Sequence, residues 1–278
     1  MIEPNTPQSG ADVAGHYNEL DDIYREIWGE HVHHGLWRTG RETVAEATNA
    51  LADLVAARLS PAAGDHLADI GCGYGKTAAR FADKLEVSVT GFTLSEEQAK
   101  VARERTGALT FHVRDWLGND MPDGSFDHAY AIESTEHIAD KQKLFLEVAR
   151  TLKPGGRFVV CAWLSEDRPS PWRVHHLLEP ICREGRLPGM GTREEYRVWA
   201  EAAGLTLLDY EDVSRQVRGT WTIVTRRVLA KLATTSRYRR YLLSREQQHR
   251  QFALSLPRLI LAYRVGAMRY GVFTFIKG

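Results

Sequence analysis

The chain has 278 residues, of which 43% are apolar, enough for one large domain or for a domain with a substantial cap. Lys and Arg number 36, and so do Asp and Glu, which excludes a chain-wide basic field of the kind that binds nucleic acid. The three cysteines form no Cys-x-x-Cys pair, no apolar run could span a membrane, and the polar N-terminus does not resemble a signal peptide, so we expect a cytoplasmic protein without a disulfide framework or zinc site.

Hydrophobic spacing and capping residues predict helices that alternate with short strands. The expected helices are Asp12–Trp28, Thr43–Leu59, Lys76–Phe81, one after a Ser95/Gln98 capping box, Lys141–Leu152 and Thr192–Ala203. The expected strands are Leu67–Ile70, Glu86–Gly91, Leu109–Arg114, Phe126–Ile132, Arg157–Trp163, Leu205–Tyr210 and Tyr270–Ile276. Such alternation indicates βαβ units and a parallel sheet.

Two segments interrupt this alternation. Arg168–Gly191 is rich in proline and glycine, with a short helical stretch around Trp172–Cys182. Asp212–Gly266 is helix-like and too long for a loop, so it should form a structured cap. The apolar cap helices favour a homodimer.

A glycine-rich turn should follow the first strand. Gly71, Gly73 and Gly75 suit a turn in which the backbone adopts positive φ and lets a ligand approach closely. The helix that follows offers free N–H groups at its start, and Asp69 at the strand's end can hold an ammonium group or orient the loop. The G-x-G-x-G spacing also fits a glycine-rich turn with no ligand.

Polar residues follow the next two strands. In nucleotide-binding βαβ units this position usually carries an acid for the ribose hydroxyls, but here it carries Thr93. Thr93 and Gln98 can hydrogen-bond a diol or simply cap a helix. Asp115 and Trp116 could bracket an adenine, unless Trp116 belongs to the core.

Three titratable residues, Glu133, Glu136 and His137, follow the fourth strand. Strand ends face the ligand crevice in open α/β sheets, and a carboxylate with an imidazole can form a general base. We expect His137 to be the base for an oxygen acceptor and Glu133 to orient the substrate. The alternative is that His137 only caps the helix near Lys141.

The segment Trp28–Trp37 is dense in aromatic and imidazole side chains. Its histidines, His31, His33 and His34, lack the carboxylate or cysteine spacing of a metal site, so we expect no metal. The segment is either a packed loop or a lid. As a lid it would close over the ligand together with Tyr17 and Tyr24, and His34 would be a further candidate base.

The motifs DIGCGYGK, GFTLSEEQ, RDW, the EH after the fourth strand and LKPGG resemble those of class I S-adenosylmethionine-dependent methyltransferases. WGEHVHHG, ESTEHIADK, the PW-x-x-HHLL of Pro171–Leu178 and the closing FTFIKG resemble the gamma-tocopherol methyltransferase group, within a small-molecule branch that also contains cyclopropane fatty-acid synthases. The resemblance implies a Rossmann-like α/β fold with a seven-stranded, mostly parallel sheet, an antiparallel last strand and a helical cap.

The resemblance also implies a cofactor, S-adenosylmethionine, and the residues that hold it. Those residues are Tyr17, Asp69, Gly71, Gly73, Gly75, Thr93, Leu94, Gln98, Asp115, Trp116 and Ile132. Within this set Thr93 and Gln98 would hold the ribose, Asp115 and Trp116 the adenine, and Ile132 and Tyr17 the methionine part.

We therefore expect one domain, with a core of about 41–164, 204–211 and 267–278 and a cap or lid of about 11–40, 165–203 and 212–266. It should methylate a small, partly apolar acceptor at O, C or N. Nothing resembling a transit peptide is seen, and Val213–Arg250 is rich in Arg, so tocopherol itself is not implied. The alternatives are a prenyl-diphosphate C-methyltransferase, a cyclase that binds the cofactor without methylating, and a non-enzymatic binding module.

Overall fold

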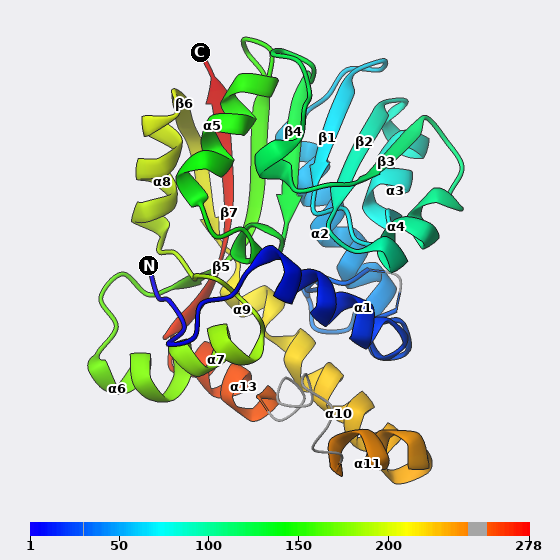
Figure 1. Ribbon diagram of the computed structural model, residues 1–278, viewed down its shortest axis with the longest axis vertical. Helices are drawn as coiled ribbons and strands as arrows, with labels where there is room; N and C mark the ends of the chain where they lie inside the picture. Colours follow the sequence, from blue (N-terminus) through cyan, green and yellow to red (C-terminus); the bar gives the residue numbers. More distant parts are fainter. Residues whose placement is uncertain (30, 244–254) are drawn as a thin grey trace.

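A twisted seven-stranded sheet forms the centre of the computed structural model, which describes residues 1–29, 31–243 and 255–278 (Figure 1). The strand order is β3-β2-β1-β4-β5-β7-β6, and only β7 runs antiparallel. The fold class implied by the resemblance is therefore confirmed. The strands are β1 His66–Ile70, β2 Ser88–Thr93, β3 Leu109–Val113, β4 His128–Ile132, β5 Arg157–Ser165, β6 Leu205–Asp212 and β7 Met268–Lys277.

The longer helices are α1 Gly10–Ile27, α2 Val44–Leu59, α3 Lys76–Leu85, α4 Glu96–Arg103, α5 Lys141–Thr151, α8 Arg193–Ala202, α10 Gly219–Thr234, α11 Ser236–Leu243 and α13 Leu256–Arg264. The shorter helical segments are η1 Trp116–Gly118, η2 Thr135–His137, α6 Pro171–Arg173, η3 Val174–Leu178, α7 Glu179–Glu184 and α9 Ser214–Val217.

The sheet has an apolar core on each face because its central strands alternate their side chains. In β4, Tyr130 packs on one side with Phe81 of α3 and with α2, whereas Ala129 and Ala131 pack on the other side with α5. Parallel strands that are buried on both faces have nearly continuous apolar sequences, and the central strands of this sheet follow that pattern.

Complete capping boxes form at two helices, whereas the box predicted at a third helix forms only in part. Capping boxes form at α2, between Thr43 and Glu46, and at α8, between Thr192 and Glu195. At α4 only half of the predicted box forms: the Ser95 side chain accepts from the Gln98 backbone, but the Gln98 side chain accepts from the Thr93 hydroxyl at 2.7 Å. The predicted Ser95/Gln98 capping box is thus wrong in its second half, because Thr93 takes the Gln98 amide.

Most predicted elements are present with shifted ends. The second strand begins at Ser88 rather than Glu86, because Glu86 has a left-handed φ of 55° and ends α3. The fourth begins at His128, two residues late, and the last extends over Met268–Lys277. Asp140, not His137, caps α5.

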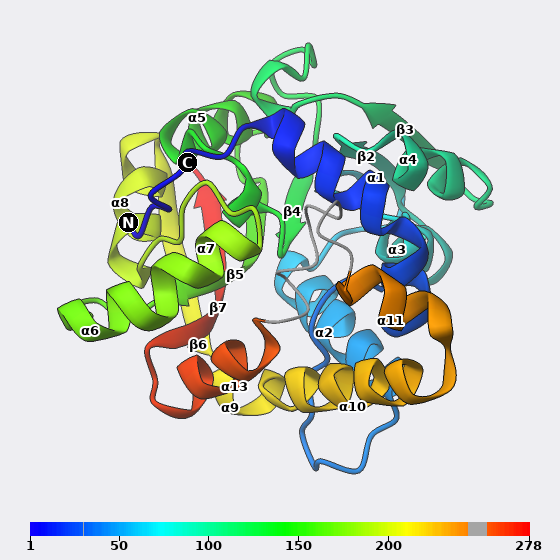
Figure 2. The same cartoon turned by 60° about the horizontal axis from the view of Figure 1, so that its bottom comes forward.

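Helices of the cap lie beyond the carboxyl ends of the parallel strands (Figure 2). There α11 lies beside the end of α1, where Arg237 and Lys231 pair with Glu26 at 2.7 and 2.8 Å. One segment expected in the cap belongs to the main layers: α8 packs on α5 and β6 beside the sheet.

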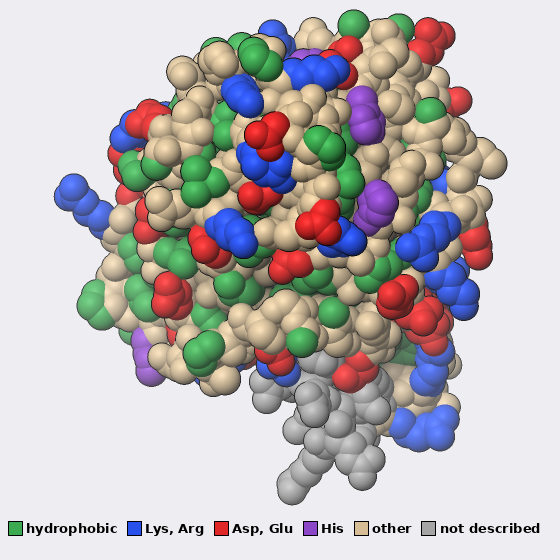
Figure 3. Space-filling model, turned by 45° about the horizontal axis from the view of Figure 1, so that its top comes forward, with side chains coloured by type: hydrophobic (Ala, Val, Ile, Leu, Met, Phe, Trp, Pro, Cys, Tyr) green, Lys and Arg blue, Asp and Glu red, His purple; other side chains and the backbone are tan. Residues whose placement is uncertain are grey.

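The distribution of charged side chains on the surface matches the equal numbers of cationic and anionic residues in the sequence. Cationic and anionic side chains are interspersed on the face shown in Figure 3, without a large field of one sign. In the described part of the chain, no helix is long and apolar enough to cross a membrane.

Candidate active site

Two connected hollows lie at the carboxyl ends of β1, β2 and β4. The first, here called the cleft, contains about 720 Å³ of empty space, part of it open to solvent. The second, here called the aromatic cavity, contains about 480 Å³ of empty space, also partly open to solvent. The cleft is lined by Gly71, Gly73, Phe92, Thr93, Leu94, Gln98, Asp115, Trp116 and Ile132, among others. The aromatic cavity is lined by Trp28, His34, Glu136, Trp163, Gly185, Leu187 and Trp221.

Four residues line both hollows: Tyr17, Val32, Glu133 and His137. They come from α1, the loop after it, and the segment after β4, which are distant in sequence. A molecule in the cleft and another in the aromatic cavity would therefore meet at these four side chains.

The three glycine positions of the turn after β1 differ in what an added side chain would contact. All have positive φ. A Cβ at Gly71 would lie 2.2 Å from the Ser134 Cβ, and one at Gly75 would lie 2.7 Å from the Phe111 ring, so these two allow close packing. A Cβ at Gly73 would meet no atom within 4 Å. Gly73 lines the cleft and leaves space for a ligand, whereas Gly75 does not line it.

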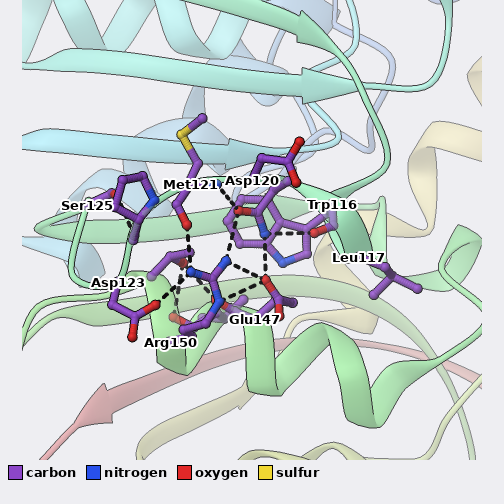
Figure 4. Close-up of polar contacts among 12 residues, drawn as sticks. Trp116, Leu117, Asp120, Met121, Asp123, Ser125, Glu147 and Arg150 are labelled. Atoms are coloured by element: carbon purple, nitrogen blue, oxygen red, sulfur yellow. Dashed lines mark hydrogen bonds and ion pairs between the residues drawn. The ribbon is translucent and has the colours of Figure 1, made fainter.

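A polar network fixes the turn that carries Asp115 and Trp116 into the cleft. The Asp115 side chain accepts from the Leu117 backbone at 2.9 Å, and Asn119 donates to the Trp116 carbonyl at 2.9 Å. Figure 4 shows Arg150 of α5 beneath this turn, donating to Glu147 and to the Met121 carbonyl. The orientation of Trp116 therefore depends on residues that sequence patterns did not single out.

Trp116 is both a core residue and a cleft residue. It is 3% exposed and packs edge-on against Phe92, with 5.0 Å between ring centroids. Its indole N–H is buried and has no hydrogen-bond partner in the described part of the chain. The two interpretations of Trp116 therefore do not exclude each other.

Glu133 is the most heavily hydrogen-bonded carboxylate of the site. Oε1 accepts from the His34 backbone N–H at 2.6 Å and from the Tyr270 hydroxyl at 2.8 Å. Oε2 accepts from His34 Nδ1 at 2.8 Å and from Trp163 Nε1 at 2.9 Å. Burial alone would raise the pKa of Glu133, but the His34 imidazole and these hydrogen bonds lower it to about 2. Glu133 also has a left-handed φ of 53°, a strained conformation typical of functional sites.

His34 is held by Glu133 and surrounded by aromatic rings. Its side chain is 1% exposed and lies edge-on to Trp163 and Trp221. Because Nδ1 faces a carboxylate, which can only accept, Nδ1 carries a proton, and Nε2 is the nitrogen that could take up another proton. Nε2 is buried without a hydrogen-bond partner among the described residues.

In contrast to His34, His137 has a polar partner at each of its ring nitrogens. Its Nε2 lies 3.0 Å from the Tyr17 hydroxyl, and its Nδ1 lies 3.4 Å from the Arg186 carbonyl. Burial lowers the pKa of His137 to about 4 and raises that of Tyr17, so both are neutral near pH 7. The structure thus brings all three candidate catalytic residues together but leaves an unpaired nitrogen only on His34.

Glu136 lies deeper than Glu133. It is 2% exposed, accepts from the Trp163 backbone N–H, and burial raises its pKa. Lys141 is equally buried, and burial lowers its pKa to about 8. Because Glu136 is bonded to the backbone of Trp163, and both residues line the aromatic cavity, Glu136 supports the wall of this cavity.

The described aromatic residues of the expected lid lie in different parts of the structure. Tyr17 lines both hollows, and Trp28 lines only the aromatic cavity. Trp37 lies away from both, with its indole N–H donated to Thr220 at 3.2 Å, because the chain there pairs with α9 and α10. The Tyr24 side chain lies outside the described part of the structure.

Comparison with known proteins identifies the fold's family. The family model for mycolic acid cyclopropane synthetase matches residues 5–252. The chain belongs to this family. The 27-O-demethylrifamycin SV methyltransferase of Amycolatopsis mediterranei (strain S699) is 36% identical over 213 residues, which cover 74% of this chain and 78% of that protein.

Two further similarities cover more of the chain. The chloroplastic tocopherol O-methyltransferase of Arabidopsis thaliana is 28% identical over 289 residues, covering 95% of this chain and 81% of that protein. The crystal structure of the 4+2-cyclase SpnF has a TM-score of 0.80 at 26% identity, covering 99% of this chain and 98% of that one. The protein is an S-adenosylmethionine-dependent methyltransferase, which excludes the non-enzymatic binding module.

The residues of the cleft fit the cofactor of this methyltransferase family. The open space at Gly73, the unpaired indole N–H of Trp116 and the polar side chains of Thr93, Gln98 and Asp115 suit a polar ligand that carries a flat ring. Of the eleven residues predicted to hold it, nine line the cleft; Asp69 and Gly75 do not. Among the described residues, no group of three or more His, Cys, Asp or Glu could hold a metal ion.

The residues that sequence reasoning missed are the partners of Glu133 and His34. Trp163, Tyr270 and Trp221 come from β5, β7 and α10, and no local motif marks them. Trp163 and Tyr270 are paired across the antiparallel β5–β7 ladder, a contact that only the sheet topology reveals.

Proposed function

We propose that this methyltransferase methylates a hydroxyl oxygen of a small, uncharged, largely apolar acceptor bound in the aromatic cavity. His34 accepts the proton of that hydroxyl, and Glu133 holds the imidazole in the required tautomer. The observation that carries this proposal is the unpaired Nε2 of His34, whose Nδ1 is 2.8 Å from a carboxylate, in the wall of a cavity that adjoins the cleft.

The sequence favoured His137 as the base, but its surroundings support it less well than those of His34. Both His137 ring nitrogens have partners: Nε2 lies 3.0 Å from the hydroxyl of Tyr17, and Nδ1 lies 3.4 Å from the Arg186 carbonyl. Burial lowers its pKa to about 4, which makes it a weak proton acceptor at neutral pH. We assign to His137 and Tyr17 the role of positioning residues at the junction of the hollows.

Glu133 is also a poor base. Four donors occupy its oxygens, and a carboxyl with a pKa of about 2 takes up a proton only in strong acid. Its interactions suit the orientation of His34, as in other carboxylate–imidazole pairs that activate an oxygen nucleophile.

The lining of the aromatic cavity favours an uncharged acceptor. Three tryptophans, two carboxylates and two histidines line it, and among the described residues it has no Lys or Arg. A diphosphate would face Glu133 and Glu136 without a cation, so the prenyl-diphosphate alternative has less support. A cyclase would have no use for a carboxylate-held imidazole, so the cyclase alternative has less support as well.

The cofactor would bind in the cleft, with Thr93 and Gln98 toward its hydroxyls and Asp115 and Trp116 toward its base. When bound, it supplies an electrophilic methyl group on a sulfonium centre. The chain's own residues then bring the acceptor to the junction and exclude water, and His34 holds the released proton. The relatives named as O-methyltransferases support the choice of oxygen.

An acceptor screen with isotope-labelled cofactor tests the proposal. Uncharged phenols, quinols and glycosides should take up label on oxygen, whereas prenyl diphosphates and amines should not. His34→Ala should lower turnover by roughly 10²–10⁴-fold while the affinity for S-adenosylhomocysteine stays unchanged. Labelled product on carbon or nitrogen only, or normal turnover in His34→Ala, would overturn it.

We also infer a cytoplasmic location and a homodimer from the sequence. Three exposed apolar residues of the cap support a contact between subunits: Leu229 in α10, Leu261 in α13 and Val265 just after α13. Cell fractionation and light scattering test these two inferences; a monomer at micromolar concentration would rule out the stable homodimer.

A further inference from the structure

The wall of the aromatic cavity includes a turn with a rare backbone conformation. Gly185 and Leu187 line the cavity, and Arg186 lies between them in the chain. Arg186 has a left-handed φ of 55°. This conformation is unusual for residues other than glycine and persists only where the surrounding structure enforces it. Something other than local backbone preference must therefore favour Arg at this position.

The turn is the end of helix α7. The Leu187 N–H donates to the Cys182 carbonyl at 2.8 Å, and the Arg186 N–H donates to the Arg183 carbonyl at 3.4 Å. These two bonds form a Schellman motif, in which Arg186 holds the position that is usually glycine. Glycine would satisfy this motif without the steric cost of a Cβ, so the end of the helix alone does not account for Arg186.

The Arg186 side chain has a partner in the N-terminal segment. Its guanidinium donates to Gln8 Oε1 at 3.1 Å, and Gln8 Nε2 donates to the Thr6 carbonyl at 2.8 Å. Gln8 is 6% exposed, so water replaces little of what either bond supplies. Gln8 thus connects the guanidinium to the backbone of the N-terminal segment, a contact that glycine at position 186 could not make.

The N-terminal residues 2–8, here called the brace, follow α7 and the loop after it (Figure 1). Ile2 and Met190 exchange two backbone hydrogen bonds, both 2.8 Å long. The Asn5 N–H donates to Glu179 Oε1 at 3.1 Å. The brace is therefore attached on both sides of the turn, at the start of α7 and in the loop beyond it.

The backbone of the same turn reaches the junction of the two hollows. The Arg186 carbonyl lies 3.4 Å from His137 Nδ1, and His137 lines both hollows. Gln8, Arg186 and Leu187 do not line the cleft. A change in the brace should therefore act on the aromatic cavity and leave the cofactor cleft as it is.

We propose that the brace sets the shape of the acceptor site and that Arg186 is the positioning residue through which it does so. With its guanidinium bound to Gln8, Arg186 keeps Gly185 and Leu187 in the cavity wall. A looser wall would bind a small apolar acceptor less tightly, because fewer of its contacts would be formed in advance. This inference rests on the proposed function in placing the acceptor in the aromatic cavity.

Calorimetry on the protein saturated with S-adenosylhomocysteine tests this role with 1-naphthol, an uncharged apolar phenol. Arg186→Gly and Gln8→Leu should each weaken 1-naphthol binding by about tenfold and leave the affinity for S-adenosylhomocysteine unchanged. The double variant should bind no more weakly than either single one, because both changes remove the same bond. Arg186→Lys, which keeps a donor for Gln8, should restore most of the affinity.

A matched control separates the side chain of Arg186 from its backbone conformation. Glu86 also has a left-handed φ of 55°, ends α3 and lines neither hollow. Glu86→Gly should therefore leave the binding of both ligands unchanged. Unchanged 1-naphthol affinity in Arg186→Gly, or an equal loss in Glu86→Gly, would overturn the proposal. If Arg186→Gly fails to fold, Gln8→Leu still decides, because it removes the same bond and leaves the turn intact.

Amide hydrogen exchange tests the brace without any acceptor. Gln8→Leu should speed exchange by about fivefold or more at Leu187 and Met190, whose N–H groups are hydrogen-bonded in and beside the turn, and leave β1 unchanged. Exchange equal to that of the unmodified protein would overturn the proposal. Methylation on carbon or nitrogen, or no binding of 1-naphthol, would count against the proposed function and leave the exchange result as it is, so the two failures are distinguishable.

Discussion

Replacing Glu133 with Gln should cost both stability and activity, because each of its oxygens faces one donor that cannot reverse its role. Oε1 faces the His34 backbone N–H, and Oε2 faces the Trp163 indole N–H. The Gln amide has one oxygen and one NH₂ group, so one fixed donor must meet another donor, whichever way the amide turns. The two groups that can adapt are the Tyr270 hydroxyl and His34 Nδ1.

The size of the effect follows from these contacts. A hydrogen bond to a charged group contributes about 1.5–3 kcal/mol, and the side chain of Glu133 is 7% exposed, so solvent replaces little of what is lost. The Glu133→Gln variant should lose about 2–5 kcal/mol of unfolding free energy, or roughly 3–9 °C in melting temperature. Its turnover should fall by about 10²–10⁴-fold, because His34 is no longer held with its proton on Nδ1.

Thermal unfolding and single-turnover methyl transfer measure the two losses, and the exposed Glu211→Gln is the control. The pH dependence has a definite sign. Because the pKa of Glu133 is lowered to about 2 in the folded protein, its contribution is complete above the ordinary carboxyl pKa of about 4.5 and is lost as the pH falls toward 2. Glu133→Gln should remove this part of the acid sensitivity. A variant with unchanged melting temperature and turnover would refute the role given to Glu133.

Further substitutions and conditions separate the other roles. Gly73→Val should abolish binding of S-adenosylhomocysteine, because its Cβ would enter the cleft at a left-handed φ of 52°; calorimetry showing unchanged affinity would contradict this. His137→Ala should lower turnover by about tenfold or less, since its Nε2 is engaged by Tyr17; a loss above a hundredfold would return the base to His137. Chelators should leave activity unchanged, and activity that is lost with EDTA and restored by a divalent ion would favour a diphosphate acceptor instead.

Local sequence signals predicted the elements well because each element carries its own pattern. The buried run Leu67–Ile70 and the glycine turn after it need no distant partner to be recognised. Ends were less predictable: Glu86 looked like the start of a strand, but a left-handed φ of 55° makes it the end of α3. The predicted Ser95/Gln98 box failed for a similar reason, because Thr93, in the preceding strand, competes for the Gln98 side chain.

The active site was predictable only in its parts. Glu133, His34 and His137 were all selected from their positions, since strand ends and a histidine-rich loop mark them. Their division of roles depends on contacts between residues that are distant along the chain. Tyr17 lies 120 residues from His137, and Tyr270 lies 137 residues from Glu133. Such contacts follow from sheet order and helix packing, which motif spacing does not encode.

The position of the transferred methyl group tests the central claim most directly. The methyltransferase would be incubated with S-adenosylmethionine labelled with ¹³C in the methyl group and with an uncharged phenolic acceptor from the screen, and the product examined by carbon NMR. We predict a methyl carbon bonded to oxygen, formed by the unmodified protein and reduced by at least about a hundredfold in His34→Ala. A labelled methyl on carbon or nitrogen, or equal O-methylation by His34→Ala, would contradict the account.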